Sequence, residues 1–88
     1  MKAGEGDAAQ DPIPGRLRWL CRRGMLELDA WLQPFLERRY PELDAKARAD
    51  FERLLDLEDF QLYDFLTRAS QPPPDLRGIV DQLLSSRH

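Results

Sequence analysis

Residues 16–39 read RLRWLCRRGMLELDAWLQPFLERR, a stretch that predicts two consecutive helices meeting at a glycine. In its first part, Leu17, Leu20 and Cys21 recur at the i, i+3, i+4 spacing of one helix face. The second part repeats this pattern with Met25, Leu28, Leu32, Phe35 and Leu36. Gly24 is expected to end the first helix, because glycine readily adopts the left-handed conformation that often closes one. The stretch therefore predicts a helical hairpin.

The rest of the chain predicts three more amphipathic helices. The five predicted helices span residues 16–23, 25–39, 44–55, 60–69 and 75 onward. Asp44 and Asp59 are the expected N-caps of the third and fourth, because an aspartate oxygen can accept from free first-turn N–H groups. The last helix has the clearest apolar pattern, formed by Leu76, Ile79, Val80, Leu83 and Leu84. No segment alternates with the period of a strand. The predicted fold class is all-α, a compact five-helix bundle in a single domain.

The composition is typical of one folded domain with a polar, well-hydrated surface. The chain has 88 residues, of which 42% are hydrophobic and 33% charged, and its net charge is −3. Residues 1–15, which are acidic and rich in Gly and Ala, are predicted to be a disordered tail, and residues 16–88 the helical domain. No apolar run approaches the ~20 residues of a membrane span. The N-terminus fits neither a signal peptide nor a presequence, so we expect a cytoplasmic bacterial protein that does not bind membranes.

The residue types that commonly carry catalysis are not arranged for it. The only histidine is the terminal His88 and the only cysteine is Cys21, so neither a nucleophile–base pair nor a metal-ligand cluster is predicted. The acids between Asp56 and Asp64 surround a helix start, where negative charge is favoured by ~0.3–1 kcal/mol each. There is no glycine-rich phosphate loop. We therefore predict a binding module without a metal or cofactor of its own, and not an enzyme.

Residues 22–27, Arg-Arg-Gly-Met-Leu-Glu, are the candidate binding surface, named here the 22–27 corner. The four arginines within residues 16–23 form a basic patch on an acidic chain, which suits an acidic partner surface. Arg16 and Arg23, seven positions apart, would flank Trp19 on one continuous helix. Glu27 falls off the core stripe, and Gly24 would let a partner's backbone approach closely.

Helix geometry alone leaves a second interpretation of this corner open. Arginines in a last turn, a glycine after them and a glutamate in the next first turn are ordinary capping choices. Asp29 lies at the edge of the core face and is predicted to be a structural hydrogen-bond acceptor. The candidate partner-binding residues are Arg16, Trp19, Arg22, Arg23, Gly24, Met25 and Glu27.

Residues 19–29, WLCRRGMLELD, resemble the Trp-x-x-Arg-Arg-Gly-Met-x-Glu-Leu-Asp signature of the SdhE family, small assembly factors for the flavoprotein subunit of succinate dehydrogenase. The similarity extends over roughly residues 16–84. It implies a five-helix protein that binds the flavoprotein subunit and promotes covalent attachment of FAD, without holding FAD stably itself. By position, it implies that Arg23, Gly24 and Glu27 form the functional centre.

The sequence alone leaves three points open, namely the range of clients, the oligomeric state and the class of function. The flavoprotein subunit of fumarate reductase is a conceivable second client, and the free protein is expected to be a monomer. A helix–glycine–helix element also loosely resembles a helix-turn-helix DNA binder. Against nucleic acid, Glu27 and Asp29 would face phosphates at the start of the recognition helix. A purely structural helical subunit is a third class, but the chain lacks the large exposed apolar stripe that it would need.

Overall fold

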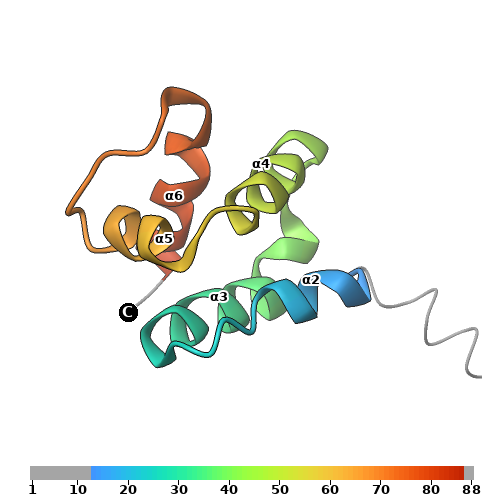
Figure 1. Ribbon diagram of the computed structural model, residues 1–88. Helices are drawn as coiled ribbons and strands as arrows, with labels where there is room; N and C mark the ends of the chain where they lie inside the picture. Colours follow the sequence, from blue (N-terminus) through green and yellow to red (C-terminus); the bar gives the residue numbers. More distant parts are fainter. Residues whose placement is uncertain (1–12, 87–88) are drawn as a thin grey trace, which may run out of the picture.

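The computed structural model describes residues 13–86, which form five α-helices and one 3-10 helix (Figure 1). The α-helices are α2 (Gly15–Leu20), α3 (Leu26–Arg38), α4 (Ala45–Leu55), α5 (Asp59–Leu66) and α6 (Pro74–Ser86). The 3-10 helix η1 (Tyr40–Glu42) joins α3 to α4. The predicted all-α class and five-helix architecture are confirmed.

Helices α2 and α3 form a hairpin, and the other three α-helices pack on it. In Figure 1, α2 and α3 run side by side at the bottom, and α4, α5 and α6 lie above them. Helix α6 contacts α3, α4 and α5, so the C-terminal helix ties the two parts together. This arrangement leaves the outer face of α2 and the α2–α3 connection at the edge of the molecule.

A single hydrophobic core runs through all five helices. Its most deeply buried side chains are Leu17, Cys21, Leu28, Leu32, Phe35, Leu36, Phe51, Leu54, Leu55, Leu62, Val80 and Leu83. Phe51 of α4 packs on Phe35 of α3 with ring centroids 5.2 Å apart, and on Tyr40 of η1 at 5.9 Å. Each such side chain contributes about 1.5–3 kcal/mol by leaving water. The predicted apolar stripes are therefore the core, except that Leu20, Met25 and Leu84 are only partly buried.

The helix ends agree with the sequence at some positions and differ at others. Asp44 caps α4 as predicted, since its Oδ1 accepts from the N–H of Ala47 at 2.8 Å. The prediction that Asp59 caps the fourth helix is wrong. Glu58 is the N-cap and forms a capping box with Gln61, whose Oε1 accepts from the Glu58 N–H at 3.0 Å. Asp59 is instead the first helical residue, and its carboxylate pairs with Arg23.

Two helices end earlier than predicted. Helix α5 ends at Leu66 and not at Ala69, because Arg68 adopts a φ of 65° and the N–H of Ala69 turns back to the Asp64 carbonyl. Helix α2 ends at Leu20, so the predicted helix over 16–23 extends three residues too far at its C-terminal end.

The helical domain starts earlier than predicted. Ile13 is 6% exposed and belongs to the core, and Gly15 begins α2. Two residues of the predicted tail, Ile13 and Gly15, therefore belong to the core and to α2. Residues 1–12 of the predicted tail, which was expected to span residues 1–15, lie outside the described residues.

Candidate partner-binding surface

The 22–27 corner is the connection between α2 and α3. Two hydrogen bonds close the end of α2, from Cys21 N–H to the Leu17 carbonyl and from Arg22 N–H to the Trp19 carbonyl, each 3.0 Å long. Gly24 follows with a φ of 81°, in the left-handed region that favours glycine. It lies beyond the helix end, so it turns the connection toward α3 and is not the helix stop that the sequence predicted.

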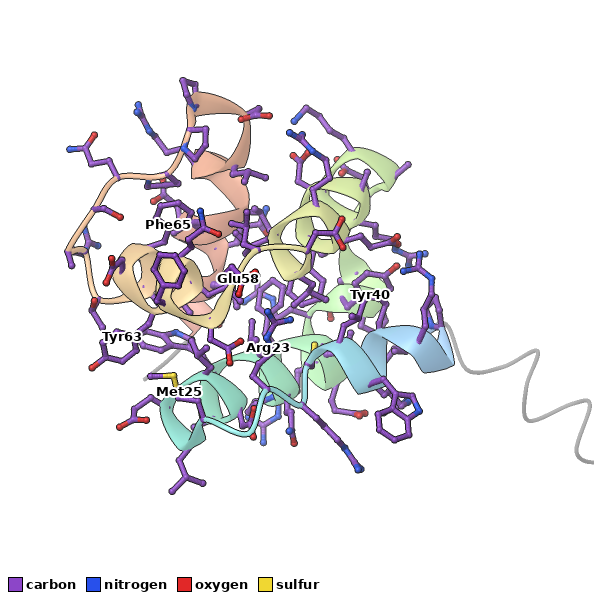
Figure 2. All side chains as sticks on the ribbon, in the orientation of Figure 1. Arg23, Met25, Tyr40, Glu58, Tyr63 and Phe65 are labelled. Carbon is purple, nitrogen blue, oxygen red and sulfur yellow. The ribbon has the colours of Figure 1, made fainter. Side chains whose placement is uncertain are left out.

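Arg23 is the anchor of this corner, and its side chain is only 12% exposed. Its Nε donates to Asp59 Oδ1 at 2.8 Å. The remaining hydrogen bonds of the guanidinium go to three backbone carbonyls, those of Leu20 and Leu55 at 2.9 Å and of Leu57 at 2.5 Å. Figure 2 shows Arg23 directed toward the turn between α4 and α5, where Glu58 lies. The side chain thus fastens the 22–27 corner to that turn.

Asp29 secures the same corner from the other side. Its Oδ1 accepts from the backbone N–H of Arg23 at 2.8 Å, so the predicted structural role of Asp29 is confirmed. The backbone and the side chain of Arg23 are both held, one by α3 and the other by α5. The geometry of the corner is therefore set by partners 6 and 36 positions away in the chain.

The expected placement of Trp19 between two arginines is wrong. It assumed one continuous helix over 16–23, but α2 ends at Leu20 and Arg23 turns toward α5. Arg16 pairs instead with Glu52 of α4 at 2.5 Å, and Arg18 pairs with Glu37 of α3. These ion pairs are substantially exposed, so each contributes at most about 1 kcal/mol. Their effect is to orient α2 against its neighbours.

The predicted residues that remain accessible form the outer side of the corner. Trp19 is 76% exposed, and Arg22, Gly24 and Glu27 are also exposed. A Cβ placed on Gly24 would meet no atom within 4 Å, so the space above this backbone is open. Met25 is partly buried against the core, at the point where the start of α3 faces α5 (Figure 2).

Sequence reasoning missed two exposed apolar side chains near this surface. Leu26 opens α3 with 83% exposure, and Phe60 in the first turn of α5 is 66% exposed. Both positions lie two residues before the first core residue of their helix, Leu28 or Leu62. In the sequence, both residues could have been recognised as apolar side chains that lie outside the core-facing positions of their helix.

Burial governs the chemistry of the one thiol. Cys21 is fully buried at the end of α2, and desolvation raises its pKa from 9.0 to about 12 against the opposing charge of Arg23. A thiol of this kind is a packing residue and a poor nucleophile.

Among residues 13–86, no three His, Cys, Asp or Glu side chains are grouped to hold a metal ion. No helix in that part of the chain is long and apolar enough to span a membrane.

Comparison with known proteins shows the family of this chain. A family model described as "Flavinator of succinate dehydrogenase" matches residues 15–87, which is nearly the whole helical domain. The chain belongs to this flavinator family. The resemblance drawn from the Trp19–Asp29 signature is therefore confirmed.

Several curated relatives of the flavinator family are similar over most of their length. A protein of Pseudomonas aeruginosa named FAD assembly factor SdhE is 46% identical over 70 residues, covering 78% of this chain and 83% of the relative. Proteins with the same name from Methylococcus capsulatus and Shewanella oneidensis are 50% and 44% identical, each covering 84% of the relative and 78% and 77% of this chain. The helix-turn-helix alternative gains no support from these relatives.

Proposed function

We propose that this chain is a non-catalytic assembly factor that binds the flavoprotein subunit of succinate dehydrogenase and promotes covalent attachment of FAD to it. The observation that carries the proposal is the 22–27 corner, a rigid connection with open backbone space at Gly24 and an exposed carboxylate at Glu27. Membership of the flavinator family and the names of its relatives support the choice of client. The factor binds its client in the cytoplasm, before the client joins its complex.

The proposed mechanism is conformational. A flavin and its acceptor side chain can form their bond once they are held in register, and orientation alone can supply several kcal/mol. A partner that binds one arrangement of the client's domains more tightly shifts the population toward that arrangement. The corner suits this role because Arg23 and Asp29 hold it from both sides, so little ordering is needed on binding. The factor itself is proposed to hold no FAD stably.

The test compares covalent flavin in the apo flavoprotein subunit with and without this chain. Purified subunit is incubated with FAD and resolved on a denaturing gel, where covalently bound flavin fluoresces. We expect the wild-type chain to increase the fluorescent band. The Glu27→Ala variant should bind the subunit about tenfold or more weakly, since loss of a central interface contact costs ~1.4 kcal/mol or more, and it should lose the stimulation.

A matched control is Glu42→Ala, which removes an exposed glutamate from η1. It changes the net charge equally and should leave stimulation intact. Equal covalent flavin with and without the wild-type chain would contradict the proposed function. The same assay with the fumarate reductase flavoprotein decides whether that subunit is also a client.

A further inference from the structure

A groove crosses the outer side of the α2–α3 hairpin, next to the 22–27 corner. It consists of two adjacent hollows that share Arg18 and Arg22. The first, of about 380 Å³, lies between α2 and the middle of α3 and reaches Pro34 and Arg38. The second, of about 280 Å³, lies along α2 beside Trp19. We name the two together the α2–α3 groove.

The charge of the α2–α3 groove is positive. Three arginines line it, at positions 18, 22 and 38, against the single carboxylate of Glu37, which pairs with Arg18. Arg22 and Arg38 are exposed and form no ion pair with any residue that the structure describes. The whole chain carries a net charge of −3, so this is a local reversal of its charge. Two unpaired guanidinium groups in one groove favour a ligand that brings carboxylates.

Apolar surface accompanies these charges. Trp19 is 76% exposed at one end of the groove, although burying an indole would be favourable. Pro34 is an exposed ring in the middle of α3, at the other end. Tryptophan and arginine are the side chains most enriched among residues that dominate binding energy in protein interfaces.

We propose that the α2–α3 groove binds an acidic segment of the client protein, with its carboxylates on Arg22 and Arg38 and an apolar side chain on Trp19. This inference rests on the proposed function, which supplies the client, and extends the binding surface from the corner to the middle of α3. Pro34 and Arg38 become part of the surface, outside the signature by which the chain resembles its family. The groove steers and holds the client while the corner selects its conformation.

The test measures the affinity of the purified apo flavoprotein subunit for full-length variants by biolayer interferometry at low and physiological salt. The double variant Arg22→Glu, Arg38→Glu should weaken binding about a hundredfold, roughly tenfold for each reversed charge, and should lower the salt dependence of the association rate. Trp19→Ala should weaken binding by raising the dissociation rate. Thermal unfolding by circular dichroism confirms that each variant is folded.

The matched control is Arg77→Glu, which reverses an exposed arginine on α6 outside the groove. It should bind as the wild type does. Unchanged affinity in the double variant would overturn the proposal that this groove binds the client. An equal loss of affinity in the Arg77→Glu control would overturn it as well. Tight binding of a fluorescent DNA duplex at physiological salt that the double variant abolishes would also overturn it, in favour of a nucleic-acid ligand. A wild-type chain that does not bind the subunit at all would instead overturn the proposed function.

Discussion

Gly24 combines two properties that can be separated by mutation. Its φ of 81° favours glycine, while the space around its Cα is open. We expect Gly24→Ala to cost about 1–2 kcal/mol of folding free energy through backbone strain alone, since no atom blocks the methyl group. Gly24→Asn should cost less, because asparagine tolerates this conformation.

The asparagine variant therefore isolates the contact role of the position. If a client backbone approaches Gly24, Gly24→Asn should melt near the wild-type temperature and still fail to support covalent flavin attachment, and Gly24→Arg should fail as well. The measurements are thermal unfolding and in-gel flavin fluorescence. Full activity of Gly24→Asn would mean that the glycine serves the turn and nothing else.

Cys21 makes stability depend on alkaline pH. Burial raises the pKa of its thiol from 9.0 to about 12, so between these values the unfolded chain loses a proton that the folded chain keeps. The stability due to the neutral thiol is complete below about pH 9 and is lost as pH rises toward 12. Burial and Glu52 also raise the pKa of Tyr40, which acts in the same direction.

The contribution of Cys21 is isolated by comparison with Cys21→Ala. We expect the free energy of unfolding of the wild type, from urea denaturation, to fall more steeply between pH 9 and pH 11 than that of the variant. The variant retains Tyr40, so the difference between the two slopes belongs to the thiol. Parallel slopes would contradict the raised pKa.

At the scale of helices, Arg23 joins elements that are far apart in the sequence. Its guanidinium satisfies the carbonyls of Leu55 and Leu57 and pairs with Asp59, so it connects the α2–α3 hairpin to the α4–α5 turn. Arg23→Ala leaves these groups without a partner and should destabilise the fold by about 2–4 kcal/mol. Arg22→Ala, the adjacent exposed arginine, should change stability by less than about 0.5 kcal/mol.

Urea denaturation followed by circular dichroism measures both variants. Arg23→Lys adds a sharper comparison, because an ammonium group keeps the charge but lacks the fork that reaches several acceptors at once. We expect Arg23→Lys to recover part of the stability and not all of it. Equal stability of Arg23→Ala and Arg22→Ala would show that the hydrogen bonds of Arg23 do not hold the corner.

At the scale of the whole molecule, the domain should be complete from Ile13 onward. The acidic, Gly- and Ala-rich sequence of residues 1–11 predicts no packed structure, so we expect their removal to change the free energy of unfolding by less than about 0.5 kcal/mol. Ile13→Ala, which removes a side chain only 6% exposed, should cost about 2 kcal/mol or more. Urea denaturation of the truncated protein and of Ile13→Ala measures both effects. A truncated protein that is clearly less stable than the full chain would show that part of the tail contributes to the fold.

The sequence by itself determined the helices and the core, because both follow from local spacing. Leu28, Leu32 and Phe35 share a helix face whatever the rest of the chain does, and burial of that face follows from its apolar surface. The Trp19–Asp29 signature was also readable without coordinates and identified the family. Sequence also marked Gly24 and Glu27 as candidates, and both are exposed at the corner.

Only the tertiary structure decided what the arginines of the signature do. Arg23 and Arg22 are adjacent and chemically identical, yet one is held by Asp59 and the Leu55 and Leu57 carbonyls while the other faces solvent. These three partners of Arg23 lie 32–36 positions away, and no local pattern encodes which of two neighbouring side chains will reach them. Local periodicity specifies which faces are buried, but long-range hydrogen bonds specify which charges remain free to bind a partner.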